Sequence, residues 1–273
     1  MRTGNGIAPP YDPEVTTGAA VEIDDVEVRF RTRKQDVTAL REVSLRVEPG
    51  EFVAIVGASG CGKSTLLKLV SGLLSPSSGR VRLHGQDVRG PRRDIGYVFQ
   101  RAALLEWRTA RRNILLQAEM RRMPKEGARE RADELMAMTG LTGFEDAYPH
   151  ELSGGMQQRV ALCRALLHQP PVLLMDEPFG ALDALTREQM NVELRRIWRE
   201  TGTTVLLVTH SIAEAVYLAD RVIVMTPRPG TVAEIIPVAL PAERKYGETM
   251  AEPEFARATG RIRDLLGAAP GAE

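Results

Sequence analysis

The sequence predicts an α/β fold that carries a helical insertion. Short apolar runs typical of buried parallel strands alternate with segments of helical periodicity. A glycine-rich loop joins one such run to a helix, and apolar residues recur at helical spacing between about residues 101 and 170. A chain of 273 residues can also bury a sizeable core.

The first elements follow from the order of apolar residues. Residues 1–19 are rich in Gly, Pro and Thr and predict a loose tail. Apolar residues alternate with one break over 21–30, which predicts a strand with a bulge or bend. Residues 43–47 alternate cleanly, and 52–56 form a continuous apolar run typical of a buried parallel strand. A helix is expected from Lys63 to about Gly72, followed by strands at "VRL" and "IGYVF".

The second half of the chain begins with the predicted helical insertion. Strand patterns then return at 172–175, 204–209 and 221–225, with helices between them. A final helix places four apolar residues on one face, which predicts that it docks on its own domain; they are Phe255, Ile262, Leu265 and Leu266. We therefore expect one domain over 20–240 and a C-terminal extension over 241–273.

Composition excludes several classes of protein. The chain has 36 Lys and Arg against 36 Asp and Glu, so its bulk charge favours neither nucleic acid nor an anionic membrane surface. Its two cysteines argue against a disulfide scaffold. The N-terminus lacks the apolar stretch of a signal peptide, and no window approaches a membrane-spanning length. Any membrane role is therefore expected to come through a partner.

The strongest motif is a candidate phosphate-binding loop. "GASGCGKS" fits the pattern G-x-x-x-x-G-K-[ST], with a buried strand before it and a helix after it. Gly60 and Gly62 allow the backbone N–H groups to point at phosphate oxygens. Lys63 can reach the β- and γ-phosphates, and the Ser64 hydroxyl can bind Mg²⁺. The candidate residues are Gly57, Ala58, Ser59, Gly60, Cys61, Gly62, Lys63, Ser64 and Thr65.

Two adjacent acids complete this candidate site. Asp176 ends the apolar strand "VLLMD", where proteins with such a loop place the aspartate that holds the Mg²⁺ shell. Glu177 follows directly, and its side chain points in another direction because neighbouring residues of a strand alternate. We therefore assign Glu177 the role of general base that polarises the attacking water.

A second glycine-bearing helix start, "LSGG", begins at Leu152. Ser153 could simply be a helix N-cap, which is a common role for serine. A phosphate loop already grips one side of a nucleotide, so a second amide-rich helix start could come from another copy of the chain. A head-to-tail pair of chains would then form two composite sites.

The motifs together identify a family. "GASGCGKST", "YVFQ", "LSGGMQQR", "VLLMDEPF", "ALD" and "VTH" occur in this order, and the chain resembles the ATP-binding cassette (ABC) subunit of ABC transporters over residues 21 to 238. The resemblance implies a P-loop ATPase fold with a helical subdomain and an antiparallel β subdomain. It also implies ATP and Mg²⁺ as ligands and ATP hydrolysis as the reaction.

The resemblance also implies roles for further residues. Gln100 resembles the glutamine that touches Mg²⁺ and senses the membrane partner, and Asp183 resembles the aspartate that communicates across a dimer. Phe30 stands where an aromatic ring stacks on adenine. The residues expected to bind the opposite ATP are Ser153, Gly154, Gly155 and Gln157.

His210 resembles the histidine that contacts the γ-phosphate. Its position supports this role independently, because it follows the apolar strand "TVLLVT", and parallel sheets bind ligands at the carboxyl ends of their strands. The other histidines, His84, His150 and His168, are most simply solvent-facing or structural.

Two stretches narrow the resemblance to one group. "LLEWRTARRNILL" and "VTHSIAEAVYLADRVIVMTPRPGTV" resemble the nitrate, sulfonate and taurine importers of bacteria. That resemblance implies a second copy of the chain, membrane permease subunits and an extracytoplasmic solute-binding protein as partners. It also implies a peripheral position at the cytoplasmic face of the inner membrane. Glu106 and Ala58 depart from this pattern at positions where proline is common.

Three alternatives stay open at this point. Trp107 either anchors a permease or packs inside the helical insertion. An exporter subunit would carry the same ATPase core. An ABC-type DNA clamp would need long coiled coils between its motifs, whereas this chain shows no sustained heptads and no basic stripe, so we expect no nucleic-acid partner.

Overall fold

The computed structural model describes residues 18–31 and 36–267. Most of the predicted tail, residues 1–17, lies outside the described residues. Among the described residues, no helix combines the length and the apolar character needed to cross a bilayer.

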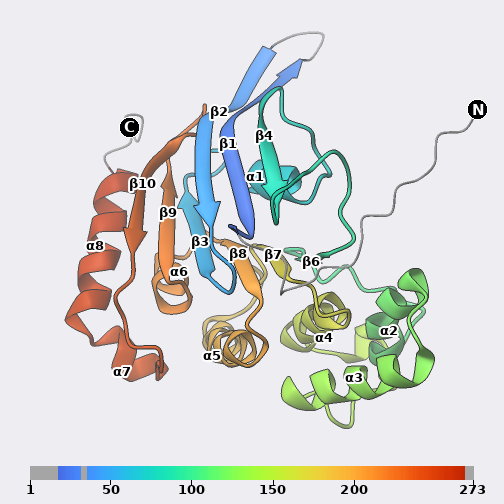
Figure 1. Ribbon diagram of the computed structural model, residues 1–273. Coiled ribbons are helices and arrows are strands. Elements are labelled where there is room, and N and C mark those ends of the chain that lie inside the picture. The colour runs from blue at the N-terminus through green and yellow to red at the C-terminus, as the bar shows by residue number, and fades with distance from the viewer. Residues whose placement is uncertain (1–17, 32–35, 268–273) are drawn as a thin grey trace, which may run out of the picture.

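The larger of two sheets has six strands. They are β3 (Phe52–Gly57), β6 (Ile95–Val98), β7 (Val172–Asp176), β8 (Thr204–Val208), β9 (Arg221–Met225) and β10 (Val232–Pro237). Their order is β10-β9-β3-β8-β7-β6 (Figure 1), with β10 antiparallel to β9 and the other neighbours parallel. Residues 52, 54 and 56 of β3 face one apolar cluster, and residues 53 and 55 face another. Burial on both faces explains the continuous apolar run in the sequence.

The smaller sheet is antiparallel. Its strands are β1 (Val21–Arg31), β2 (Asp36–Val47), β4 (Ser78–Leu83) and β5 (Gln86–Asp87), in the order β2-β1-β4-β5. The pairing of β1 with β2 shifts register between Ile23 and Val26, which confirms the predicted bulge. The strand expected at 43–47 begins earlier, at Asp36, because its first half pairs with the end of β1.

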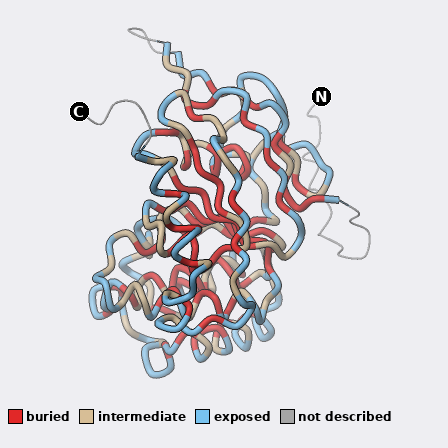
Figure 2. Tube along the Cα trace, turned by 90° about the vertical axis from the view of Figure 1, so that its left-hand side faces the viewer, coloured by how far each residue is buried: buried red, intermediate tan, exposed pale blue. Residues whose placement is uncertain are grey.

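Helices fill the space on both faces of the larger sheet. The helix α1 (Lys63–Val70) packs in the apolar cluster shared by the two sheets. The opposite face is covered by α4 (Gly154–Leu166), α5 (Ala184–Thr201) and α6 (Ile212–Leu218). Figure 2 shows the resulting buried interior running through the middle of the molecule.

The predicted helical insertion is present and contains α2 (Ala110–Arg121), α3 (Lys125–Met138) and α4, with a short 3₁₀ turn at Pro149–Glu151. Figure 1 shows α2 and α3 at one end of the molecule, beyond α4. Within the insertion, α4 is therefore the helix that lies next to the larger sheet.

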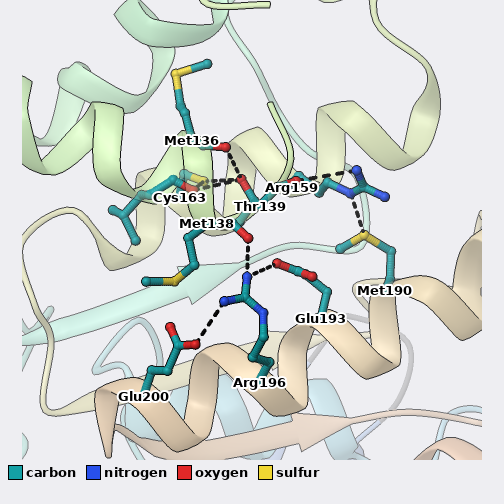
Figure 3. A network of polar contacts seen from close by, with 10 residues as sticks. Met136, Met138, Thr139, Arg159, Cys163, Met190, Glu193, Arg196 and Glu200 are labelled. Carbon is teal, nitrogen blue, oxygen red and sulfur yellow. Dashed lines mark hydrogen bonds and ion pairs between the residues drawn. The ribbon is translucent and has the colours of Figure 1, made fainter. Parts of the chain in front are cut away.

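The carboxyl end of α3 is tied to α4 and α5 by polar contacts (Figure 3). The Thr139 hydroxyl lies 3.2 Å from Cys163 Sγ, and Arg159 Nη1 donates to the Thr139 carbonyl at 3.4 Å. Arg196 of α5 donates to the Met138 carbonyl and pairs with Glu193 at 2.6 Å. Burial raises the pKa of Cys163 to about 12, so its thiol stays protonated.

The chain ends in α7 (Tyr246–Met250) and α8 (Pro253–Gly267). Phe255 and Ile262 of α8 are buried, and Leu265 and Leu266 pack beside them, so the final helix docks on its own domain as predicted. The sequence patterns missed β5, β10 and α7.

Candidate functional site

The phosphate loop lies between β3 and α1. Gly60 and Gly62 have φ values of 76° and 106°, in the left-handed region that glycine adopts without strain. Gly62 is the N-cap of α1 and, as a glycine, gives the first amides of that helix no side-chain cap. A helix start of this kind can attract an anion, because its first amides point out of the helix.

A cavity of about 620 Å³ opens beside this loop. It brings loop residues together with residues of β1 and β2 and of the segments that follow β7, β8 and β9. The lining residues are Phe30, Val37, Ala39, Gly57, Ser59, Gly60, Gly62, Lys63, Ser64, Thr65, Glu177, His210 and Arg228. Phe30 thus lies at the predicted site, with 42% of its surface exposed.

The Lys63 side chain is buried, and its ammonium lies against the backbone of the phosphate loop. Its Nζ donates to the carbonyl oxygens of Gly57 at 2.8 Å and Ala58 at 3.0 Å. The lysine therefore occupies the inner side of the loop, next to the helix start, as the sequence motif predicts.

Ser64 and Asp176 face each other across the floor of the site. The Ser64 hydroxyl donates to Asp176 Oδ1 at 2.8 Å. Burial raises the pKa of Asp176, while the hydrogen bond from Ser64 opposes that rise. A hydroxyl and a carboxylate held this close form a pair of oxygen ligands suited to a hard cation.

Glu177 lies between two residues that follow neighbouring strands. Gln100 Nε2 donates to Glu177 Oε2 at 3.2 Å, and His210 Nδ1 lies 3.4 Å from the same oxygen. Gln100 follows β6, Glu177 follows β7, and His210 follows β8, and these three strands are adjacent in the sheet. The carboxyl edge of the parallel sheet therefore brings the side chains of Gln100, Glu177 and His210 together. We expected this position for His210 because it follows an apolar strand.

The "LSGG" segment lies elsewhere. The Ser153 hydroxyl caps α4 by accepting from Met156 N at 3.3 Å, and Gln157 Nε2 donates to the Pro149 carbonyl at 2.9 Å. Ser153, Gly154, Gly155 and Gln157 are all absent from the lining of the cavity beside this chain's own phosphate loop. The local N-cap role and a contact with another chain are compatible, since Ser153 and Gly154 are exposed.

Asp183 has a local role at the start of α5. Its Oδ1 accepts from Thr186 N at 3.0 Å, and hydrogen bonds from Thr186 hold the pKa of Asp183 below its usual range. The exposed carboxylate therefore stays ionised at the helix N-terminus.

Sequence reasoning missed two residues of this region. Gln158 is 4% exposed, and its Nε2 donates to the carbonyls of Phe99 and Gln100 at 3.2 Å each. Arg228 lines the cavity although it lies on the turn after β9. In "MQQR" the sequence indicated Gln157, the neighbour of Gln158, as a site residue. The stretch that contains "TPRPG" indicated only which group of proteins the chain resembles, so neither pattern revealed these contacts.

The remaining histidines lie outside the cavity. His150 is exposed, and its ring stacks on Tyr148 at a centroid distance of 5.9 Å. Burial lowers the pKa of His84, and burial with the nearby Arg121 lowers the pKa of His168 to about 4. Their structural role agrees with the sequence interpretation.

Comparisons with known proteins agree with this geometry. A family profile described as ABC transporter matches residues 40–180. A taurine import ATP-binding protein from Roseobacter denitrificans is 43% identical over 250 residues, which cover 90% of this chain and 93% of the relative. A nitrate import ATP-binding protein from Synechocystis is 42% identical over 251 residues, covering 90% and 94%.

A solved structure is similar as well. It is described as the dimeric, post-hydrolysis state of the ATP-binding cassette MJ0796 bound to ADP and Pi. The TM-score is 0.71 at 35% sequence identity, with 80% of this chain and 98% of that chain covered.

Proposed function

The chain belongs to the ABC transporter family of ATP-binding proteins, and from this premise we propose that it is the ATP-hydrolysing subunit of an importer for a small solute. Taurine and nitrate are the solutes in the names of two relatives, and a small solute such as nitrate, a sulfonate or taurine is the proposed class of cargo. The chain itself binds and hydrolyses ATP and does not need to contact the solute.

One observation carries the proposed reaction. Glu177, Gln100 and His210 converge within hydrogen-bonding reach at the carboxyl edge of the sheet, beside the phosphate loop and within reach of its cavity. A γ-phosphate held by that loop would lie next to a carboxylate and an imidazole.

The site also fits Mg²⁺. Ser64 Oγ and Asp176 Oδ1 would supply two oxygen ligands to the ion. Gln100 donates a hydrogen bond to Glu177, the residue next to Asp176. Within the described part of the chain, no three His, Cys, Asp or Glu side chains gather as a metal site. This sparse ligand set suits Mg²⁺ bound together with nucleotide phosphates, where it would neutralise charge on the transferring group.

The catalytic roles follow from position. Glu177 polarises and accepts a proton from the attacking water, and Gln100 holds its carboxylate in place. His210 reaches the γ-phosphate from the next strand, and Lys63 supplies positive charge at the β- and γ-phosphates. The phosphate loop, from Gly57 to Thr65, fixes the nucleotide, and Phe30 stacks on its base.

A second copy of the chain completes the site. Ser153, Gly154, Gly155 and Gln157 would close over the partner's ATP, and Asp183 would lie at the same interface. The dimeric cassette named above is similar to this chain, which supports a dimer with two-fold symmetry.

The helical region supplies the proposed contact with the permease. Trp107 is 72% exposed, so the alternative in which it packs inside the insertion is wrong. Arg108 pairs with Glu119 at 2.8 Å, which holds this loop along α2, where Met120 is also exposed. We assign this apolar surface to the permease, which places the chain at the cytoplasmic face of the inner membrane.

The proposed domain bounds and the two alternative functions, a DNA clamp and an exporter subunit, can now be compared with the structure. Residues 20–240 form the proposed ATPase domain, with the helical subdomain at about 101–170, and 241–273 form an extension docked on it. A DNA clamp is disfavoured, since α2 and α3 have only 12 and 14 residues. An exporter would share the core, and the names of the relatives favour import.

The proposal is tested by purifying the chain from its native membranes in gentle detergent and identifying its partners by mass spectrometry. We expect a multi-spanning permease and, with it, an extracytoplasmic solute-binding protein. Recovery of only ribosomal or DNA-associated proteins would reject the importer function and leave an ATPase of another kind.

A further inference from the structure

The turn between β9 and β10 is closed by its two threonines. Thr226 N donates to the Thr231 carbonyl at 3.0 Å, and Thr231 N donates back to Thr226 Oγ1 at 2.9 Å. The two hydroxyls also lie 2.9 Å apart. These bonds close the Thr226–Thr231 turn at its base, where β9 and β10 meet.

Gly230 attaches this turn to β2 and presses it against the phosphate loop. Gly230 N donates to the Ala39 carbonyl at 2.9 Å, and its own carbonyl accepts from Arg41 N at 3.0 Å. A Cβ atom at Gly230 would lie 1.9 Å from the carbonyl oxygen of Cys61. Only glycine allows the turn to approach the loop this closely.

The same segment of β2 touches the loop on another side. A Cβ atom at Gly62 would lie 2.5 Å from Leu40 Cδ2 and 3.2 Å from the Ala39 carbonyl oxygen. The backbone of the phosphate loop is therefore enclosed between β2 and the Thr226–Thr231 turn.

Arg228 links the turn to the outermost part of the loop. Its Nε and Nη2 donate to the Gly60 carbonyl at 3.3 and 3.1 Å, while Gly60 itself has a φ of 76°. Within the described ranges, 18–31 and 36–267, Arg228 forms no ion pair. Among these described residues, the exposed Arg228 guanidinium therefore binds the Gly60 carbonyl rather than an acidic side chain.

We propose that Arg228 is a positioning residue for nucleotide binding, which fixes the phosphate loop through the Gly60 carbonyl. The inference rests on the proposed function, because it concerns the same ATP site. The Gly60 carbonyl and the Cys61 N–H belong to one planar peptide unit and point in opposite directions. Holding that carbonyl therefore also fixes the direction of the Cys61 N–H, which donates to the Ala58 carbonyl at 3.3 Å inside the loop. A loop held in this shape loses less conformational freedom when the nucleotide binds.

A positioning role for Arg228 predicts how the affinities for ATP and ADP change when this residue is replaced. The loop amides hold the phosphates that ATP and ADP share, so a loosened loop weakens both nucleotides by the same factor. A direct contact between Arg228 and the γ-phosphate would instead weaken ATP far more than ADP. The ratio of the two affinities therefore separates positioning from direct contact.

The experiment compares Arg228→Ala and Arg228→Lys with the wild type, and uses Arg263→Ala, an exposed arginine of α8, as the matched control. Calorimetry gives the Kd of ATP and ADP for each purified full-length chain. We expect Arg228→Ala to raise both Kd values and the KM for ATP about tenfold, as for loss of a charged hydrogen bond, with kcat changed less than about twofold. Arg228→Lys keeps one donor and should recover part of the loss.

Wild-type affinities in Arg228→Ala, or a loss confined to ATP, would overturn the inference. A wild-type chain that bound no ATP would instead reject the proposed function, so the two failures are distinguishable. A folded Gly230→Ala chain with wild-type affinity would also contradict the inference. Should that variant not fold, the arginine variants still decide.

Discussion

At the scale of single residues, the chemistry depends on how Glu177 is held. Its backbone has a φ of 47°, which is uncommon for a non-glycine residue and turns the chain sharply after β7. The turn directs the side chain toward Gln100 and His210, while Asp176 faces Ser64. This separation of two adjacent acids supports the proposed roles, metal binding for Asp176 and general base for Glu177.

Glu177→Gln tests the second role. The amide keeps the size of the side chain but cannot accept a proton, so we expect kcat to fall at least ~100-fold while ATP still binds. Stalled hydrolysis should also accumulate an ATP-bound dimer, visible by size-exclusion chromatography. The matched control is Glu252→Gln, at an exposed position far along the chain. Unchanged turnover in Glu177→Gln would remove this residue from the base role.

At the scale of elements, α4 connects two parts of the proposed mechanism. Its N-terminus carries Ser153, and one turn later Gln158 donates to the carbonyls of Phe99, Gln100 and Pro178. The helix that would reach the partner's ATP is therefore bonded to the segment that carries Gln100. A rigid connection of this kind can transmit movement between the two sites.

Gln158→Ala should break that connection. It removes the donor from three carbonyl oxygens, of which that of Pro178 is buried, so we expect a loss of about 2 kcal/mol in the free energy of unfolding and a lower kcat. Urea denaturation and an ATPase assay measure the two effects. Gln189→Ala, which removes an exposed glutamine from α5, serves as the control. A variant with full stability and full turnover would show that α4 and the Gln100 segment act independently.

At the scale of the whole molecule, the exposed surface around Trp107 is a feature that the described part of the chain leaves uncovered. The hydrophobic core does not include Trp107, and the C-terminal helix α8 buries its apolar face against the rest of the domain. Large exposed apolar side chains such as Trp107 and Met120 are typical of a surface that a partner covers.

Trp107→Ala tests this surface. Because the side chain is 72% exposed, we expect the free energy of unfolding to change by less than about 0.5 kcal/mol. Recovery of the permease from native membranes should fall, together with solute-coupled ATP hydrolysis. Ile235→Ala, an exposed apolar residue on β10, is the control. Full permease recovery with Trp107→Ala would move the docking surface elsewhere.

The sequence by itself determined the parts whose physics is local. The glycines and Lys63 define a phosphate loop because backbone conformation and charge reach are properties of a few consecutive residues. The apolar run over residues 52–56 predicted a strand buried on both faces, which β3 confirms. The break in alternation over 21–30 likewise predicted the bulge in β1.

Only the tertiary structure decided the contacts between distant segments. The exposure of Trp107, the bonds of Gln158 and the approach of Arg228 to Gly60 depend on how strands and helices pack, and no local periodicity encodes them. The short strand β5 and the edge strand β10 were missed for the same reason. Pairing with β4 and β9 stabilises them, because strand formation depends on a neighbour more than on intrinsic preference.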